Sequence, residues 1–298
     1  MKQQVWKHFW NKTVIPLSFI LPFLVLFFIF TIIPVLAAVF LSFTDYDLIS
    51  TFDFIGFDNF KKLFLEDDVF FIALKNTFTF AVITGPVGFF ASFIMAWLID
   101  QLKFRNAFSL AFYAPSITSG IALSVVWLYF FASDHYGLIN YTLLRIGILS
   151  EPIAWTMDTR TILPVIIIIS IWMSMGTGFL VFLAGFQNLP TEQFEAGRID
   201  GINNIFQELF YITLPLMKPQ LLFGAINSIV GSFAVFDVAV AVAPLPSPGY
   251  AGHTIVTHLY DYAFIRFDMG YSAAVSVVLF VITFGLGRIC TRLLSSKD

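Results

Sequence analysis

Residues 192–219 read EQFEAGRIDGINNIFQELFYITLPLMKP, a polar stretch between two long apolar segments. Its first half predicts a short helix that ends at about Asp200, because Glu192 and Glu195 complement the positive end of that helix's dipole. Gly201 follows, and glycine readily adopts the left-handed conformation that ends a helix and reverses the chain. The first half of the stretch therefore predicts a helix followed by a sharp turn.

The second half of the stretch predicts another helical segment, which leads back into the next apolar run. It passes through Phe206, Leu209 and Ile212. Pro215 and Pro219 then interrupt the backbone, because proline lacks the amide hydrogen that a helix interior needs. Together the two halves predict a helix–turn–helix that projects from the membrane. The plainer alternative is a solvated loop between two helices.

The rest of the chain has the composition of an integral membrane protein. Hydrophobic residues make up 58% of its 298 positions and charged residues 12%, with a mean hydropathy of +0.86; soluble domains carry about 25% charged residues. A helix needs roughly 20 apolar residues to cross the hydrocarbon core of a bilayer. Six runs qualify, at residues 14–43, 70–99, 107–132, 161–186, 219–243 and 270–294. The predicted fold class is an all-α membrane protein with six transmembrane helices.

The distribution of Lys and Arg predicts which helix ends face the cytoplasm. With the N-terminus inside, ten of the 16 Lys and Arg residues fall on the cytoplasmic side, in agreement with the positive-inside rule. The predicted organisation is a cytoplasmic segment at 1–13, one transmembrane domain at 14–294 with a cytoplasmic loop at 187–218, and a cytoplasmic tail at 295–298. The charge balance thus reports membrane topology and gives no sign of nucleic-acid binding.

The chain lacks the residue patterns of a nucleotide-binding or metal-dependent enzyme. It has neither a G-x-x-x-x-G-K-[ST] phosphate loop nor a G-x-G-x-x-G turn. Its single cysteine, Cys290, allows no thiolate cluster, and its four histidines are scattered along the sequence. We therefore expect no catalytic residue, no metal site and no cofactor in this chain.

The stretch at 192–219 resembles the EAA signature of the integral membrane subunits of ABC importers. That signature runs Glu-Ala-Ala, two variable residues, Asp-Gly, then an aromatic-rich part ending in Ile-x-Leu-Pro and a further proline. The matching positions are Glu195, Ala196, Asp200, Gly201, Ile212, Leu214, Pro215 and Pro219. Two departures exist, since Gly197 replaces the third-position alanine and the part between Asp200 and Leu214 is one residue longer.

This resemblance implies a type I ABC importer permease fold and a coupling role for the signature. In that family the short helix docks on a separate ATPase dimer, which holds ATP and Mg²⁺, and transmits its closure to the membrane. The residues expected to make this coupling are Glu195, Ala196, Gly197, Asp200, Gly201, Leu214 and Pro215. Further implied partners are membrane lipid, a second permease subunit and an extracytoplasmic solute-binding protein. The second subunit is expected to be a paralogue, and the alternative is an identical copy of this chain. The expected location of the complex is the cytoplasmic membrane of a bacterium or archaeon.

Other segments resemble carbohydrate-type permeases of the MalF and MalG kind. They are the outer segment FDFIGFDNFKKLF at 52–64, the Ala-Pro-Ser at 114–116 and the C-terminal TIVTHLYDYAFIRFDMGYSAAVSVVLF at 254–280. The chain departs from these permeases at 247–249, where it has Ser-Pro-Gly instead of a Thr-Gly-Gly-Gly-Pro-like loop. The resemblance implies import of a sugar or oligosaccharide, and the alternative is a polyol or a glycerol phosphate.

Candidate residues of the transport path are polar positions inside the spans, because unpaired polar groups are costly in hydrocarbon and therefore face protein or water. On the fifth span these are Asn227, Ser228, Ser232 and Asp237, and on the fourth they are Trp172 and Ser174. The serines fit close helix packing equally well. The Asp237 carboxylate is suited either to sugar hydroxyls or to a cation of a partner chain, and the Trp172 indole either to a sugar ring or to packing.

Two other classes of protein fit the sequence less well. An ion-coupled secondary transporter needs paired ionisable residues within the membrane, whereas Asp237 stands almost alone. A membrane enzyme needs converging nucleophiles, bases or metal ligands, and none are spaced for this.

The acidic residues at 66–68 are expected to form a solvated outer face or a contact with the receptor.

Overall fold

The computed structural model describes residues 15–49, 52–118 and 120–294. Within these residues the regular elements are helical, apart from one isolated β-bridge between Thr44 and Phe54. The predicted all-α class is therefore confirmed. The predicted cytoplasmic segments at 1–13 and 295–298 lie outside the described residues.

Five helical stretches in the described part of the chain are long and apolar enough to cross a membrane. They are Leu17–Leu41, Asp68–Asp100, Ile162–Gln187, Lys218–Val242 and Met269–Leu293. The run at 107–132, predicted as one span, contains two shorter helices, α6 (Arg105–Ile117) and α7 (Gly120–Phe130). These have 13 and 11 residues, so each is shorter than the roughly 20 residues that a span needs.

The chain forms two compact units. The first consists of the residues up to Glu66 together with Tyr262–Val278, and the second of Asp67–Asp261 together with the residues from Leu279 onward. The last helix, α16 (Met269–Leu294), contributes its first part to the first unit and the remainder to the second.

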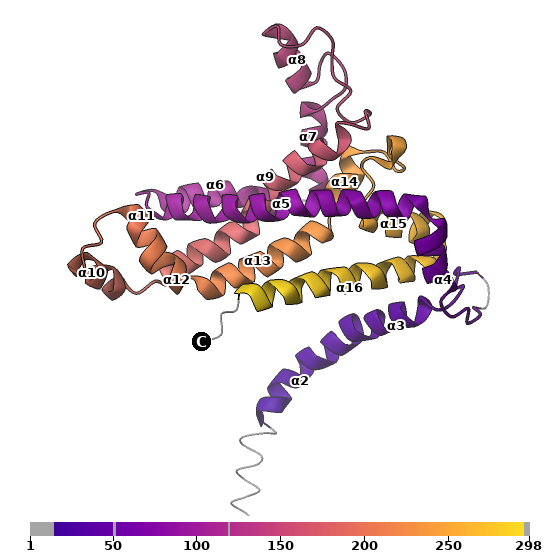
Figure 1. Cartoon of the computed structure of the whole chain (residues 1–298), viewed down its shortest axis with the longest axis horizontal. Coiled ribbons are helices and arrows are strands. Elements are labelled where there is room, and N and C mark those ends of the chain that lie inside the picture. Colours follow the sequence, from indigo (N-terminus) through magenta and orange to yellow (C-terminus); the bar gives the residue numbers. More distant parts are fainter. Residues whose placement is uncertain (1–14, 50–51, 119, 295–298) are drawn as a thin grey trace, which may run out of the picture. The chain divides into compact units, whose positions relative to one another are not determined.

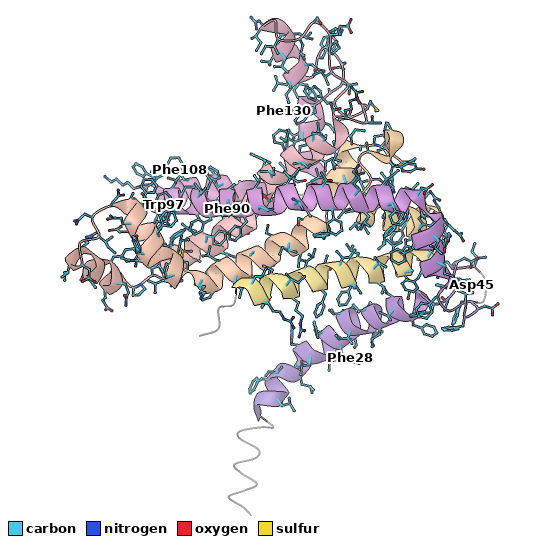
Figure 2. All side chains as sticks on the ribbon, viewed as in Figure 1. Phe28, Asp45, Phe90, Trp97, Phe108 and Phe130 are labelled. Atoms are coloured by element: carbon cyan, nitrogen blue, oxygen red, sulfur yellow. The ribbon has the colours of Figure 1, made fainter. Side chains whose placement is uncertain are left out.

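The first unit begins with one long apolar helix. It is made of α2 (Ile15–Phe27), the π-helical turn η2 (Phe28–Ile32) and α3 (Ile33–Leu41). Its most apolar part has no side chain buried within the chain, and Figure 2 shows Phe28 extending outward from the ribbon. Such a helix is suited to contact with lipid or with another membrane protein.

The outer part of the first unit is held together by polar contacts. It contains α4 (Asp58–Lys61) and the π-helical turn η3 (Lys62–Glu66). The side chain of Asn59 donates hydrogen bonds to the backbone carbonyls of Ser42 and Thr44, just after α3. Lys62 Nζ lies 2.8 Å from Oδ2 of Asp268, the residue before α16. These contacts join the outer segment to the start of the last helix.

The second unit is a helical bundle. Besides α6 and α7, its elements are α5 (Asp68–Asp100), α8 (Leu138–Arg145), α9 (Ile162–Gln187), α10 (Thr191–Ile199), α11 (Ile205–Glu208), η4 (Leu209–Thr213), α12 (Leu214–Leu216), α13 (Lys218–Phe233), α14 (Asp237–Val242), η5 (Pro248–Tyr250) and α15 (Ile255–Tyr260). The π-helical turn η6 (Asp261–Ile265) follows and belongs to the first unit from Tyr262 onward. Figure 1 shows α5 extending along the bundle, with α9 and α13 packed against it. These three helices form the framework of the unit.

Two apolar clusters fill the second unit. One lies between α9 and α14 and includes Ile162, Ile166, Val238 and Val242. The other joins α5, α9 and the start of α13, and includes Phe93, Phe182, Phe186 and Met217. The ring centroids of Phe93 and Phe182 lie 5.4 Å apart in an edge-to-face arrangement, which favours aromatic contact. On the outer surface of α5, Phe90 is exposed (Figure 2).

Candidate functional site

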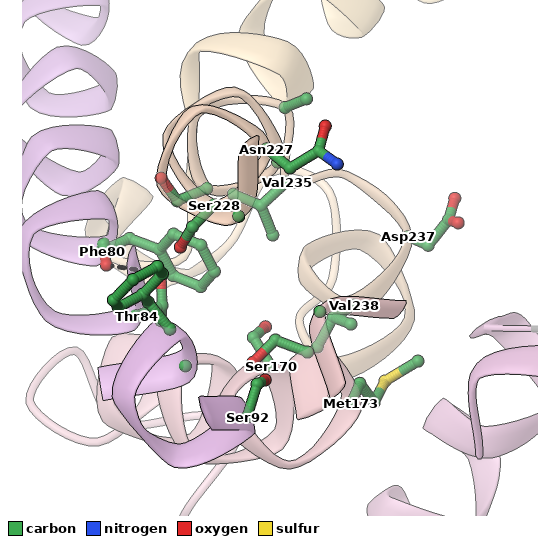
Figure 3. Close-up of a pocket in the computed structure, with 18 of the residues that line it drawn as sticks. Phe80, Thr84, Ser92, Ser170, Met173, Asn227, Ser228, Val235, Asp237 and Val238 are labelled. Atoms are coloured by element: carbon green, nitrogen blue, oxygen red, sulfur yellow. Dashed lines mark hydrogen bonds between the residues drawn. The ribbon is translucent and has the colours of Figure 1, made fainter. Parts of the chain in front are cut away.

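A cavity of about 460 Å³ lies within the second unit, between α5, α9, α13 and the start of α14. Its aromatic side chains are Phe80 and Phe89 of α5, Phe182 of α9 and Phe236 just before α14, and its polar ones are mainly hydroxyls (Figure 3). The lining residues with polar side chains are Thr84 and Ser92 on α5, Ser170 and Ser174 on α9, and Asn227, Ser228, Ser232 and Asp237 on the fifth span. A cavity of this size and composition is suited to a small polar ligand with apolar faces.

A break in the fifth span forms one wall of this cavity. The predicted helix at 219–243 is interrupted at 234–236, between the end of α13 and the start of α14. The interrupted backbone lines the cavity, and non-helical backbone at membrane depth is tolerated where it lines a cavity. Asp237 begins α14 directly after the break, so its carboxylate lies at the cavity wall.

Asp237 and Asn227 lie at one edge of the cavity. Both side chains are exposed in the isolated chain, and Figure 3 shows them pointing toward the same side, away from Phe80 and Thr84. Asp237 also lies close to α7, since a methyl group on Gly120 would stand 3.4 Å from its Oδ2 atom. The carboxylate is therefore near the first residue of α7 as well as at the cavity.

Most hydroxyls in the cavity wall already make a hydrogen bond to backbone. Those of Thr84, Ser174 and Ser232 donate to carbonyls of their own helices. Ser228 instead donates to the carbonyl of Gly85 on α5, at 2.7 Å. Ser228 therefore packs α13 against α5 as well as lining the cavity.

Ser170 differs from the other cavity serines. Its Oγ atom is buried and makes no hydrogen bond to any described residue. A buried hydroxyl without a partner costs roughly 1–3 kcal/mol. Because Ser170 lines the cavity, a hydroxyl-bearing ligand there would provide the missing hydrogen bond.

The helices α5 and α9 contact each other closely where they line the cavity. A methyl group on Gly88 of α5 would stand 2.5 Å from Ser174 Oγ, and one on Gly178 of α9 would stand 3.2 Å from Ser92 Oγ. Glycine on each helix thus accommodates a serine of the other. Small residues of this kind let membrane helices approach closely, so the serines combine packing with cavity lining.

Trp172 does not line the cavity. Its ring packs edge to face against Trp127 of α7, with centroids 5.3 Å apart. The structure therefore places this side chain in an aromatic contact between α7 and α9. The other candidates, Asn227, Ser228, Ser232, Asp237 and Ser174, are brought together around one cavity.

The helix–turn–helix predicted at 192–219 is a second candidate site. Its first helix, α10, is exposed over most of its surface, including Glu195 and Ala196, and Asp200 directly after it is exposed as well. The turn at Gly201 has the expected left-handed backbone, with φ of 92°. Ile202 N–H donates to the Gly197 carbonyl at 2.9 Å and Gly201 N–H to the Arg198 carbonyl at 3.2 Å. These two bonds form a Schellman motif, which ends the helix and reverses the chain.

Gly197 marks the point where α10 lies against the following segment. It is buried, and a methyl group there would stand 2.5 Å from the Cδ1 atom of Ile212 in η4. This close approach gives a physical reason for glycine where the EAA signature has alanine. Arg198 and Glu208 add an ion pair between α10 and α11, at 3.6 Å.

The segment after the turn is anchored in the apolar core. Met217 is fully buried in the cluster formed with α5 and α9, and Leu209 and Leu214 pack against that cluster. The ring of Phe206 in α11 contacts that of Trp97 near the end of α5, with centroids 5.8 Å apart. Phe182 belongs to the same cluster and also lines the cavity. Packed side chains thus connect the helix–turn–helix with the cavity.

The sequence did not single out Thr84, Ser92 or Ser170. Thr84, Gly88 and Ser92 are spaced four residues apart, so they form a small-residue face on α5 that the sequence could have indicated. One expectation about the acidic residues at 66–68 was wrong, because Asp67 is buried, whereas Glu66 and Asp68 are exposed. Nearby, the rings of His253 and His258 lie 5.5 Å apart.

Comparisons with known proteins find similar chains along almost the whole length. The chain is 36% identical over 268 residues to a probable ABC transporter permease protein, YesP, of Bacillus subtilis, covering 89% of this chain and 85% of that one. It is 31% identical over 298 residues to the arabinooligosaccharides transport system permease protein AraP of the same organism, covering 99% and 93%. It is 32% identical to the lactose transport system permease protein LacF of Rhizobium radiobacter, covering 88% and 87%.

Solved structures with a similar fold include a chain of a bacterial ABC transporter that imports the acidic polysaccharide alginate. The TM-score is 0.81 at 21% identity, and the match covers 98% of each chain. A chain from the alginate transporter in complex with an alginate-bound periplasmic protein gives a TM-score of 0.82 at 20% identity, covering 99% of this chain and 100% of that one. No protein-family model matches the chain.

Proposed function

The chain belongs to the permease subunits of carbohydrate ABC importers, and from this premise we propose that it forms half of the membrane path for a sugar or oligosaccharide. The observation that carries the proposal is the exposed helix α10 with its Schellman turn, joined through packed side chains to a polar cavity. An ATP-driven path needs these two parts, a surface that receives the motion of an ATPase and a cavity that the motion opens or closes.

We propose that α10 is the coupling helix. It presents Glu195, Ala196 and Asp200 to solvent, and it is held to η4 through Gly197 and to α11 through Arg198. Movement of α10 by a docked ATPase would therefore carry η4 and α12 with it. Because Met217 is buried against α5 and α9, the movement would reach the helices that enclose the cavity. ATP shifts the permease between its two conformations only if it binds the assembly more tightly in one of them. A decisive shift needs a difference of several kcal/mol in binding free energy.

The proposed assembly contains this chain, a second permease subunit, an ATPase dimer that binds ATP and Mg²⁺, and an extracytoplasmic solute-binding protein. Asn227 and Asp237 are exposed at one edge of the cavity, where a second permease would complete it. We place the assembly in the cytoplasmic membrane of a bacterium or archaeon, with both termini and α10 on the cytoplasmic side, since ten of the 16 Lys and Arg residues then lie inside.

A sugar is the substrate class that the comparisons favour. Two of the relatives are permeases whose names specify arabinooligosaccharides and lactose. The cavity adds hydroxyl and amide groups beside the rings of Phe80, Phe182 and Phe236. Polar groups that fix hydroxyls and aromatic faces that cover apolar ring surfaces are together suited to a carbohydrate.

The proposal is tested by identifying what co-purifies with this chain from its own membranes in mild detergent. We expect mass spectrometry to find an ATP-binding subunit and a second permease with the wild type. With Glu195→Lys, which reverses a charge on exposed α10, we expect the ATPase to be lost and the second permease to be retained. Glu151→Lys makes the same charge change at an exposed position far from α10 in the sequence and serves as the control. A chain that purifies alone and still transports would overturn the proposal.

A further inference from the structure

The charge of the cavity wall limits which glycans can pass. Of the described residues that line the cavity, Asp237 alone has an ionisable side chain. The rest of the lining is apolar, hydroxyl or amide, so this half of the path offers a carboxylate and no cation. Resting on the proposed sugar path, we propose that Asp237 makes the path selective for uncharged glycans and disfavours those that carry carboxylate or phosphate groups.

The position of Asp237 places its charge where a ligand would meet it. The residue begins α14 directly after the break in the fifth span and is exposed in the isolated chain. Its side chain points to the same side of the cavity as the Asn227 amide (Figure 3). A ligand that enters from this side would pass both groups before reaching the hydroxyls deeper in the cavity.

A neutral glycan and its acidic counterpart interact differently with the Asp237 carboxylate. A neutral sugar gives hydroxyl donors to the Asp237 carboxylate, which gains charge-assisted hydrogen bonds. An anionic sugar loses hydration on entry and meets a like charge, with no Lys, Arg or His in this lining to compensate it. Repulsion from the Asp237 carboxylate and the loss of hydration without a compensating cation both weaken binding of the anionic glycan. Asp237 therefore discriminates between the two ligands.

A second role for Asp237 has to be separated from this one. Its Oδ2 atom lies close to Gly120 at the start of α7, and a carboxylate stabilises a helix N-terminus. Asp237→Asn is therefore the informative variant, because it removes the charge and keeps an oxygen that can accept a hydrogen bond. Asn227→Asp adds a second carboxylate at the same edge with almost no change in shape, and it tests the inference in the opposite direction.

The experiment measures binding of glycan pairs to the whole complex of this chain with its partner permease and ATPase, purified in lipid nanodiscs. Equilibrium dialysis uses radiolabelled galactotriose against trigalacturonate, and maltotriose against its C6-oxidised form. Each pair differs in oxidation of the primary hydroxyl to a carboxylate. We expect the neutral member to bind the wild type at least about tenfold more tightly, equivalent to 1.4 kcal/mol. Asp237→Asn should reduce that ratio, and Asn227→Asp should increase it.

The outcomes separate the inference from the proposed function. Equal binding within a pair, or a ratio unchanged in both variants, overturns charge selection, while binding of the neutral glycan still supports a sugar path. Loss of the second permease from the Asp237→Asn complex also overturns the inference, because it assigns the carboxylate to an ion pair between subunits. If none of the four glycans binds the wild type, the inference is overturned, because no neutral glycan is then preferred; the co-purification experiment tests the proposed function separately. Glu151→Gln, an acidic-to-neutral change away from the cavity, should leave every ratio unchanged.

Discussion

Nε2 of His258 lies 3.1 Å from Oδ2 of Asp67, which joins α15 to the residue before α5. The other carboxylate oxygen, Oδ1, accepts a hydrogen bond from Phe70 N–H at 3.0 Å and so caps the start of α5. Both side chains are buried, with 1% and 8% of their surface exposed. One carboxylate therefore fixes both the start of α5 and the short helix α15 far along the sequence.

Replacing Asp67 by alanine should destabilise the protein. The loss of the helix cap costs about 1 kcal/mol, and the loss of this partner of the buried His258 costs a further 1–3 kcal/mol, roughly. We expect a lower midpoint of thermal unfolding for Asp67→Ala, measured in detergent by intrinsic fluorescence. Asp68→Ala is the matched control, since Asp68 is the next residue and is exposed. An equal shift in both variants would contradict this reading of Asp67.

The side chain of Asn76 makes a second connection between α5 and the outer loop. Its Nδ2 atom donates to the carbonyls of Tyr250, Ala251 and His253, at 3.0, 3.2 and 3.0 Å. Asn76→Asp keeps the shape but removes both N–H donors, so the loop should open more often. Hydrogen exchange of peptides covering 246–257 should be faster in this variant. Thr79→Ala, an exposed position one turn along α5, should leave the exchange unchanged.

The sequence predicted best the parts of the chain that depend on local chemistry. The turn at Gly201 follows from the conformational freedom of one residue, and the structure has the expected left-handed backbone there. The continuous apolar runs likewise predicted long helices. Backbone N–H and C=O groups without hydrogen bonds are costly in lipid, and a helix satisfies all of them within one segment. Both signals are present within a short stretch of sequence.

Features that depend on residues far apart in the sequence were predicted poorly. The burial of Asp67 depends on His258, and nothing near Asp67 in the sequence indicates that partner. The break at 234–236 lies within an uninterrupted apolar run. Thr84 and Ser170 line the cavity only because α5 and α9 pack beside the broken span. Trp172, a candidate for the transport path, instead packs against Trp127 of α7, a contact that depends on how α7 and α9 lie together.

Gly201 should be the least replaceable residue of the helix–turn–helix. Its φ of 92° is unfavourable for a residue with a Cβ atom, by roughly 1–2 kcal/mol, although no neighbour lies within 4 Å of a methyl group there. We expect Gly201→Ala to reduce the amount of ATPase that co-purifies with the chain. Gly287→Ala is the control, because this glycine in α16 also has open space around it and no positive φ. Equal recovery of the ATPase in both variants would show that the turn tolerates a side chain.

Gly197 and Ile212 provide a test of how α10 is joined to the membrane helices. Gly197→Ala restores the Glu-Ala-Ala of the family signature, yet it places a methyl group 2.5 Å from Ile212 Cδ1. Because that atom is the end of a flexible side chain, we expect a modest loss of about 1 kcal/mol in the free energy of unfolding.

Ile212→Val removes the Cδ1 atom and should cost about 0.5–1.5 kcal/mol alone. In the double variant the new methyl group of residue 197 fills the space that Cδ1 occupied, so the two losses should not add. A double-mutant cycle of unfolding in urea, together with ATP-driven uptake, measures this coupling. Recovery of uptake in the double variant relative to Gly197→Ala would show that the contact between α10 and η4 transmits the motion. Additive losses would show that α10 moves the following segment through other contacts, of which the Arg198–Glu208 ion pair to α11 is the next to test.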